Sequence, residues 1–160
     1  MSDEASGENA PAVEKFLVFT VRDNYYALPS KLVGEVAALE KVFPLPLAGD
    51  RVRGIINRYS VPYALMDTGF LFTQTVSVSA SKIIVLKEGV EKIAFLIDEV
   101  VDIADVPADA MLVLEQDRKD VPSGVPAPSA LVAASFEWKG RTALCLDLGA
   151  VLESVKAGVP

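Results

Sequence analysis

The chain has 160 residues, of which 51% are hydrophobic, and a formal net charge of −7. This length and composition predict one domain whose buried core needs neither metal nor disulfide. The net negative charge disfavours nucleic-acid binding, which depends on neutralising phosphates, and the absence of histidine removes the most common general base and metal ligand.

The two ends of the chain are predicted tails. Residues 1–14 are small, polar and acidic and lack the apolar core of a signal peptide, so we expect them to be disordered. We place a single domain at residues 15–156 and a short tail at 157–160. No window offers the roughly 20 continuous apolar residues of a spanning helix. We therefore expect a soluble cytoplasmic protein with no direct membrane insertion.

The first part of the domain reads as short strands. Residues 16–21 and 25–28 predict a hairpin with a turn at 22–24. Pro29 favours a short helix through residues 31–33, ended by Gly34. Residues 35–39 fit a strand or a helix, and the β-rich context favours a strand. Because two prolines remove ladder donors, residues 43–47 are predicted to be an extended connector.

Residues 52–72 predict a second hairpin that ends in a short helical turn. Apolar runs at 52–56 and 61–66 flank the polar tip Asn57-Arg58-Tyr59-Ser60. Arg53 and Arg58 stand at the two ends of the first strand, so we expect positive side chains near the tip.

The rest of the domain is also predicted to consist mainly of short strands joined by turns and loops. Residues 73–81 fit an edge strand or a link, and residues 82–86 and 92–97 predict strands around a turn at 87–89. A strand continues through 100–103 after a bend at 98–99. Residues 115–130, rich in proline, predict a mobile loop. A last hairpin, 131–138 and 141–146, leads into a closing helix at 147–152.

A motif that occurs twice, the internal echo, is found at the end of each of the two hairpins that precede helices. Asp67 and Asp147 each follow a strand, and each is followed at the second position by glycine and then by apolar residues. Each carboxylate fits a helix N-cap, which stabilises a helix by about 1 kcal/mol. The echo predicts two similar β-rich halves, and the many short strands favour small barrels over an open sandwich.

Chemically reactive groups do not converge in the sequence. The residues of an acidic run could form a metal or acid–base site, but a solvated strand edge is the simpler interpretation because the alternating ligands and central glycine of a calcium loop are missing. The run consists of Asp98, Glu99, Asp102, Asp105 and Asp109. No spacing marks a nucleophile with its base, so we predict no catalytic residue, no metal and no cofactor.

Trp138 and the tyrosines are expected in the core or an interface. The lone Cys145, set among apolar residues, predicts a buried thiol in a reducing compartment.

The order of several motifs resembles the CheW family of chemotaxis adaptors. In the first half the matching stretches are residues 16–21, 26–28, 32–36, 44, 53–57, 61–62 and 65–67. In the second half they are residues 83–86, 97–103 and 144–148. The likeness extends from residue 16 to about residue 152, and it is carried by the order and spacing of the motifs together.

The resemblance implies a mainly β fold with short helices: two SH3-like five-stranded β-barrel subdomains on a shared core, whose strands are exchanged between the halves. It further implies a non-catalytic adaptor, placed at membrane-associated receptor arrays, that couples the cytoplasmic tip of a methyl-accepting chemoreceptor to the regulatory domain of a CheA-type histidine kinase. The receptor is expected in a groove between the barrels, near the second hairpin.

The resemblance also implies a set of partner-binding residues. Those that match the family's motifs are Val33, Glu35, Arg53, Gly54 and Asn57, and the tip adds Arg58 and Tyr59. Tyr59, Val33 and Phe43 are candidate apolar anchors, and Arg53, Arg58 and Glu35 are candidate rim charges.

One feature departs from the family. The tip Asn57-Arg58-Tyr59-Ser60 runs straight into Val61-Pro62, two residues shorter than the family's hairpin and without its glycine. We therefore expect another turn type here, with Arg58 replacing the family's arginine one position away. The shorter tip supports an alternative in which the chain serves another motility or regulatory phosphorelay without binding a receptor tip.

Overall fold

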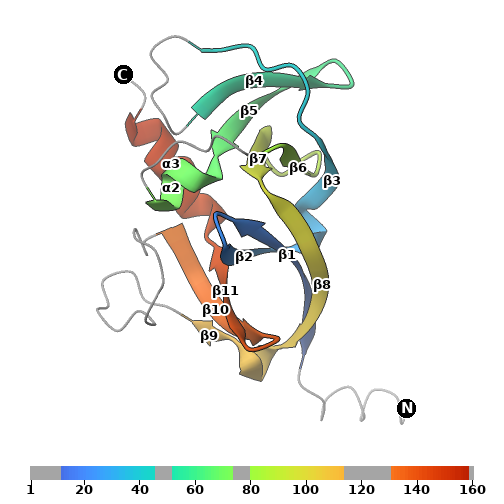
Figure 1. Cartoon of the computed structure of the whole chain (residues 1–160), viewed down its shortest axis with the longest axis vertical. Coiled ribbons are helices and arrows are strands. Elements are labelled where there is room, and N and C mark those ends of the chain that lie inside the picture. The colour runs from blue at the N-terminus through green and yellow to red at the C-terminus, as the bar shows by residue number, and fades with distance from the viewer. Residues whose placement is uncertain (1–11, 46–51, 74–79, 114–130, 159–160) are drawn as a thin grey trace.

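Two curved β-sheets, one above the other in Figure 1, make up most of the molecule, as seen in a computed structural model. The structure describes residues 12–45, 52–73, 80–113 and 131–158. The six-stranded sheet has the order β8-β1-β2-β11-β10-β9 and the five-stranded sheet the order β3-β6-β7-β5-β4. The predicted mainly β class is therefore confirmed.

The strands are short and most follow the predicted apolar runs. Those of the six-stranded sheet are β1 (Val13–Val21), β2 (Asn24–Pro29), β8 (Glu99–Pro107), β9 (Leu112–Val113), β10 (Val132–Trp138) and β11 (Arg141–Leu146). Those of the five-stranded sheet are β3 (Val33–Ala38), β4 (Val52–Arg58), β5 (Val61–Asp67), β6 (Lys82–Leu86) and β7 (Ile93–Ile97). The helices are η1 (Ser30–Leu32), α2 (Thr68–Thr73), η2 (Ala108–Ala110) and α3 (Leu148–Gly158).

The two sheets repeat one topology. The series β4-β5-β7-β6-β3 and the series β10-β11-β2-β1-β8 each begin with an antiparallel hairpin, continue with a parallel pair and end with two antiparallel pairs. Each hairpin also shifts register at the same place, between Val52 and Gly54 and between Val132 and Ala134. The first two strands of the chain join the sheet made by its last strands, so the strand exchange that the family likeness implies is observed.

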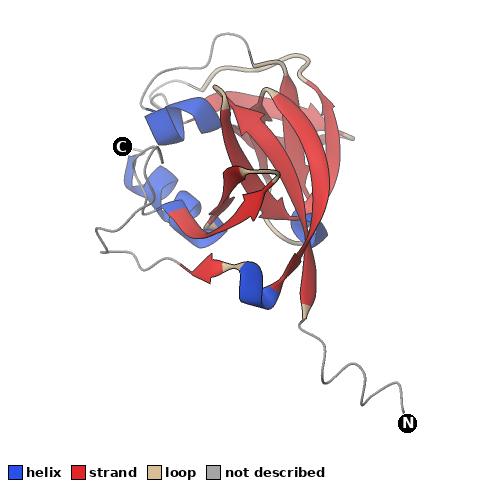
Figure 2. Cartoon of the chain, turned by 60° about the horizontal axis from the view of Figure 1, so that its bottom comes forward, coloured by secondary structure: helices blue, strands red, loops and turns tan. Residues whose placement is uncertain are grey.

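The apolar core of the described residues consists of three clusters. The largest lies between the sheets and draws on both sheets and both α-helices, through residues such as Phe19, Phe95, Phe72 and Val151. A smaller cluster belongs to each sheet alone. Helices α2 and α3 lie together at one side of the sheets (Figures 1 and 2). Full burial of a large apolar side chain stabilises the fold by about 1.5–3 kcal/mol, so this shared core fixes the sheets to each other.

Both predicted helix caps are present. The Asp67 carboxylate accepts a hydrogen bond from the N–H of Phe70 at 3.0 Å, and the Asp147 carboxylate accepts one from the N–H of Ala150 at 3.1 Å. Each satisfies one of the free N–H groups of a first helical turn. Cys145 is buried as predicted, and burial raises the pKa of its thiol to about 12.

Several boundaries differ from the sequence predictions. Strand β1 begins at Val13, within the predicted tail, because its first residues pair with the end of β8. Gly34 does not end a helix; it lies in β3, where a Cβ would meet the backbone oxygen of Leu86 at 3.1 Å. The closing helix continues to Gly158. The predicted link at 73–81 and the predicted loop at 115–130 lie largely or wholly outside the described residues.

Candidate partner-binding site

The β4–β5 hairpin turns through two residues that have left-handed backbone conformations. Tyr59 has φ 53° and Ser60 has φ 68°. Positive φ at both central positions is the mark of a type I′ turn, whose twist matches the strands but which normally uses asparagine or glycine. A bulky aromatic residue with positive φ is an outlier and has to be held in place by its surroundings.

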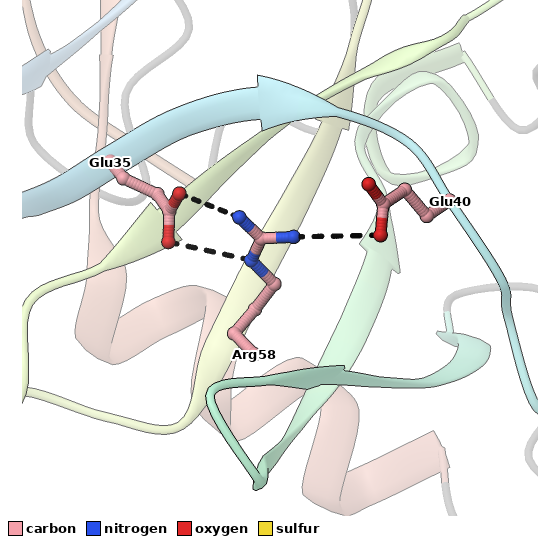
Figure 3. A network of polar contacts seen from close by, with 3 residues as sticks. All are labelled: Glu35, Glu40 and Arg58. Atoms are coloured by element: carbon pink, nitrogen blue, oxygen red, sulfur yellow. Dashed lines mark hydrogen bonds and ion pairs between the residues drawn. The ribbon is translucent and has the colours of Figure 1, made fainter.

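An ion pair braces this tip. The Arg58 guanidinium donates to Glu35 through Nη2 at 2.7 Å and through Nε at 3.4 Å, and its Nη1 lies 3.9 Å from Glu40 (Figure 3). The hydrogen bond to Glu35 raises the pKa of the Arg58 guanidinium above its ordinary value. Since β3 and β4 are the two edge strands of their sheet, the pair spans from one edge to the other.

Tyr59 is presented to solvent by this braced turn. Its side chain is 84% exposed, and the Arg58 guanidinium lies 5.5 Å from the centre of its ring. A rigidly held, exposed aromatic ring is the kind of anchor that carries energy in protein interfaces. Tyr59 therefore has the geometry of an interface residue.

A groove of about 720 Å³ opens beside the tip. Val61, Tyr63 and Val90 give it an apolar lining, and charged side chains of the β6–β7 turn line it together with Arg58 and Tyr59. The groove belongs wholly to the five-stranded sheet, since it lies between the β4–β5 tip and the β6–β7 turn. It is thus near the predicted hairpin, although it does not run between the two sheets.

Arg53 and Gly54 lie at the far end of β4 from the tip. Arg53 Nε donates to the fully buried Asp67 carboxylate at 3.1 Å, so Arg53 is not a rim charge near the tip. Gly54 has φ 148°, and a Cβ there would approach the carbonyl oxygen of Phe43 to 2.4 Å. The geometry gives both residues a structural role at this end of the hairpin.

The last two predicted residues occupy different environments. Val33 is half-buried and packs against the shared core, a position unsuited to an exposed anchor. Asn57 is exposed and lines a small pocket of about 70 Å³ with Phe43 and Arg58. The structure therefore brings Glu35, Arg58, Tyr59 and Asn57 together.

Sequence reasoning missed the other wall of the groove. Tyr63 and Val90 line it, and so do Glu88, Glu91 and Lys92 of the β6–β7 turn. The turn itself was predicted, but only the parallel pairing of β5 with β7 shows that it lies beside the hairpin tip. One signal was available in the sequence: the apolar runs at 16–21 and 83–86 each open one half of the chain. They match β1 with β6, and therefore the β1–β2 turn with the β6–β7 turn.

The acidic run lies mainly on β8, as the simpler interpretation proposed. Asp102 accepts a hydrogen bond from Trp138 Nε1 at 2.7 Å, Asp105 pairs with Lys15 at 2.7 Å, and Asp98 accepts from the backbone of Arg22. Within the described ranges, no three acidic or cysteine side chains converge on a possible metal position. Among these same residues, no helix is long and apolar enough to cross a membrane.

Comparison with known proteins agrees with this architecture. A family model described as the CheW-like domain matches residues 15–156. The crystal structure of the scaffolding protein TtCheW from Thermoanaerobacter tengcongensis has a TM-score of 0.71 to this chain, with 18% identity over 88% of each chain. No curated protein matches the sequence. At this identity the structural likeness speaks for the fold, and the family match covers nearly the whole domain.

Proposed function

The chain belongs to the CheW-like domain family, and we propose that it acts as a non-catalytic adaptor that couples the cytoplasmic tip of a chemoreceptor to the regulatory domain of a CheA-type histidine kinase. Such an adaptor would work in the cytoplasm, at membrane-associated receptor arrays. It needs surfaces that recognise proteins, and it needs no reactive group.

The observation that carries this proposal is the braced, exposed tip of the β4–β5 hairpin. Glu35 and Arg58 hold the turn, and Tyr59 projects from it beside a groove with an apolar lining. An apolar anchor surrounded by charges is the usual composition of a protein interface. Because the turn is already held in its conformation, a partner would not have to order it on binding.

A second candidate function is a CheW-like module that serves another phosphorelay. The observation in its favour is the two-residue turn, since the family's longer hairpin places its arginine differently. Both candidates use the same tip, but only the first requires binding to a receptor.

Co-sedimentation with a kinase regulatory domain and with receptor fragments separates the two. We expect the wild-type protein to bind both. Binding to the kinase without any binding to the receptor at low salt would contradict the bridging role and favour the second candidate. Binding to neither would contradict both candidates.

Two matched substitutions assign the tip. Tyr59→Ala should weaken binding by about tenfold or more, the loss expected for an interface anchor, and Arg58→Ala should weaken receptor binding before kinase binding. Lys139→Ala is the control, because Lys139 occupies the equivalent turn position in the other sheet. An unchanged receptor affinity in both tip variants would contradict the assignment of the receptor to this tip.

A further inference from the structure

The groove beside the tip has an equivalent location in the six-stranded sheet. When the two hairpins are aligned on Asp67 and Asp147, Arg58 corresponds to Trp138 and Tyr63 corresponds to Ala143. The parallel pairings extend this match, because Ala143 pairs with Tyr25, and the position that corresponds to Tyr25 on the other sheet is Lys92, just before Ile93. The same gap between hairpin tip and neighbouring turn therefore occurs twice.

In the six-stranded sheet the chain fills this gap with its own aromatic side chains. The rings of Tyr25 and Trp138 lie 5.2 Å apart, with Arg141 over Tyr25 at 5.2 Å and Lys139 over Trp138 at 5.1 Å. Such pairs and cation contacts each stabilise by about 0.5–1 kcal/mol at partly exposed sites. An aromatic pair is thus the occupant that this architecture accepts at the gap.

In the five-stranded sheet the corresponding positions hold two cations. Arg58 and Lys92 replace Trp138 and Tyr25, and the gap between them is open as the groove of about 720 Å³. This volume is within the range of protein sites that enclose a ligand group. The apolar side chains and the adjacent cations favour the face of an aromatic ring.

The charges of the β6–β7 turn add a second preference. Glu88 and Glu91 are exposed at the groove, and no described residue forms an ion pair with either carboxylate. Two unpaired carboxylates beside an apolar floor favour a basic residue next to the aromatic one.

We propose that this groove binds an aromatic side chain, followed by a basic residue, from a protein partner, in the place where the other sheet stacks Tyr25 on Trp138. This rests on the proposed function, since it names the chemistry that the partner surface presents. The partner's aromatic side chain fills the gap in the five-stranded sheet, as Tyr25 and Trp138 fill the equivalent gap in the six-stranded sheet.

The test uses the full chain and blocked dipeptides, with no kinase or receptor. N-acetyl-Trp-Lys-amide is titrated to about 10 mM, the range expected for so small a ligand, while backbone amide resonances are followed by NMR. We expect shifts at residues 61–63 and 88–92. The Trp-Glu dipeptide should bind about threefold more weakly, because it meets two carboxylates, and the Leu-Lys dipeptide should bind more weakly still.

A groove-filling variant supplies the decisive control. Lys92→Tyr places an aromatic ring at the position of Tyr25 and should abolish the shifts, whereas Lys15→Tyr, at an exposed position on β1, should leave them unchanged. The proposal is overturned if the shifts fall elsewhere, if Leu-Lys binds as well as Trp-Lys, or if Lys92→Tyr binds like the wild type. These results are independent of whether the wild-type protein co-sediments with kinase and receptor.

Discussion

The two sheets share one topology, but the gap beside the hairpin tip is filled in the six-stranded sheet and open in the five-stranded sheet. In the six-stranded sheet the hairpin tip is closed by the chain itself, through Trp138, which packs on Tyr25 and donates to Asp102. In the five-stranded sheet Arg58 takes the place of Trp138 and Glu35 that of Asp102, and the gap beside them stays open.

The two hydrogen-bonded pairs, Arg58–Glu35 and Trp138–Asp102, occupy equivalent positions in their sheets. Glu35 and Asp102 lie at the same register shift, on β3 opposite β6 and on β8 opposite β1. Each receives a hydrogen bond from the residue that precedes a hairpin turn. Because the topology occurs twice, each sheet can be compared with the other. The gap beside the hairpin tip is filled by side chains of the chain itself in the six-stranded sheet and is open in the five-stranded sheet, and we expect a partner to bind at the open gap.

Substitution of Gly54 should produce the largest effect and should separate the two sheets most clearly. Gly54→Ala forces a Cβ against the carbonyl of Phe43 at a φ that side chains rarely adopt, so we expect the free energy of unfolding to fall by about 3 kcal/mol. Urea denaturation measures this. Ala134 holds the equivalent position without a positive φ, and Ala134→Gly should cost only about 1 kcal/mol. Equal losses would show that the Phe43 contact is not what requires glycine.

The two helix caps should differ by a smaller amount. Asp67 is fully buried and binds Arg53 as well as the first turn of α2, whereas Asp147 is half-buried and the residue equivalent to Arg53 is Ala133. Asp67→Ala should therefore destabilise by about 2–3 kcal/mol, since a bond to a charged group is lost, and Asp147→Ala by about 1 kcal/mol. The two midpoints of thermal unfolding provide the comparison. A larger loss for Asp147→Ala would contradict the role of Arg53.

A gain in stability is expected at Tyr26. Its side chain is fully buried, and no described residue accepts or donates a hydrogen bond at its hydroxyl, whose pKa is raised by burial. The equivalent residue in the five-stranded sheet is the apolar Ile93. Tyr26→Phe removes an unsatisfied polar atom and should stabilise the protein by about 1 kcal/mol. Tyr63→Phe is the control and should change stability by less than about 0.5 kcal/mol, and a loss at Tyr26→Phe would reveal a partner for the hydroxyl.

Local patterns predicted the elements well, and pairing between distant segments explains what they did not predict. Most strands were found because β-branched and aromatic residues alternate between turn formers, and the two N-caps because Asp67 and Asp147 share one motif. The brace between Glu35 and Arg58 joins residues 23 positions apart across two sheet edges, and no local pattern encodes it. The same holds for the groove wall at Glu88 and Glu91, which depends on the parallel pairing of β5 with β7.

The smallest expected effect is the pH response of the hydrogen bond between Trp138 and Asp102 in the six-stranded sheet. The hydrogen bond from Trp138, with help from the Ile103 N–H and Lys139, lowers the pKa of Asp102 below its ordinary value of 3.8. A carboxyl whose folded pKa is lowered contributes its stability fully above its unfolded pKa and loses it as the pH falls through the folded pKa. Trp138→Phe removes the largest cause, so the Asp102 pKa should move back toward 3.8, which NMR titration of the carboxyl carbon measures. If Trp138→Phe left the Asp102 titration unchanged, the indole would not be what holds that carboxylate, and the equivalence of the two hydrogen-bonded pairs would fail.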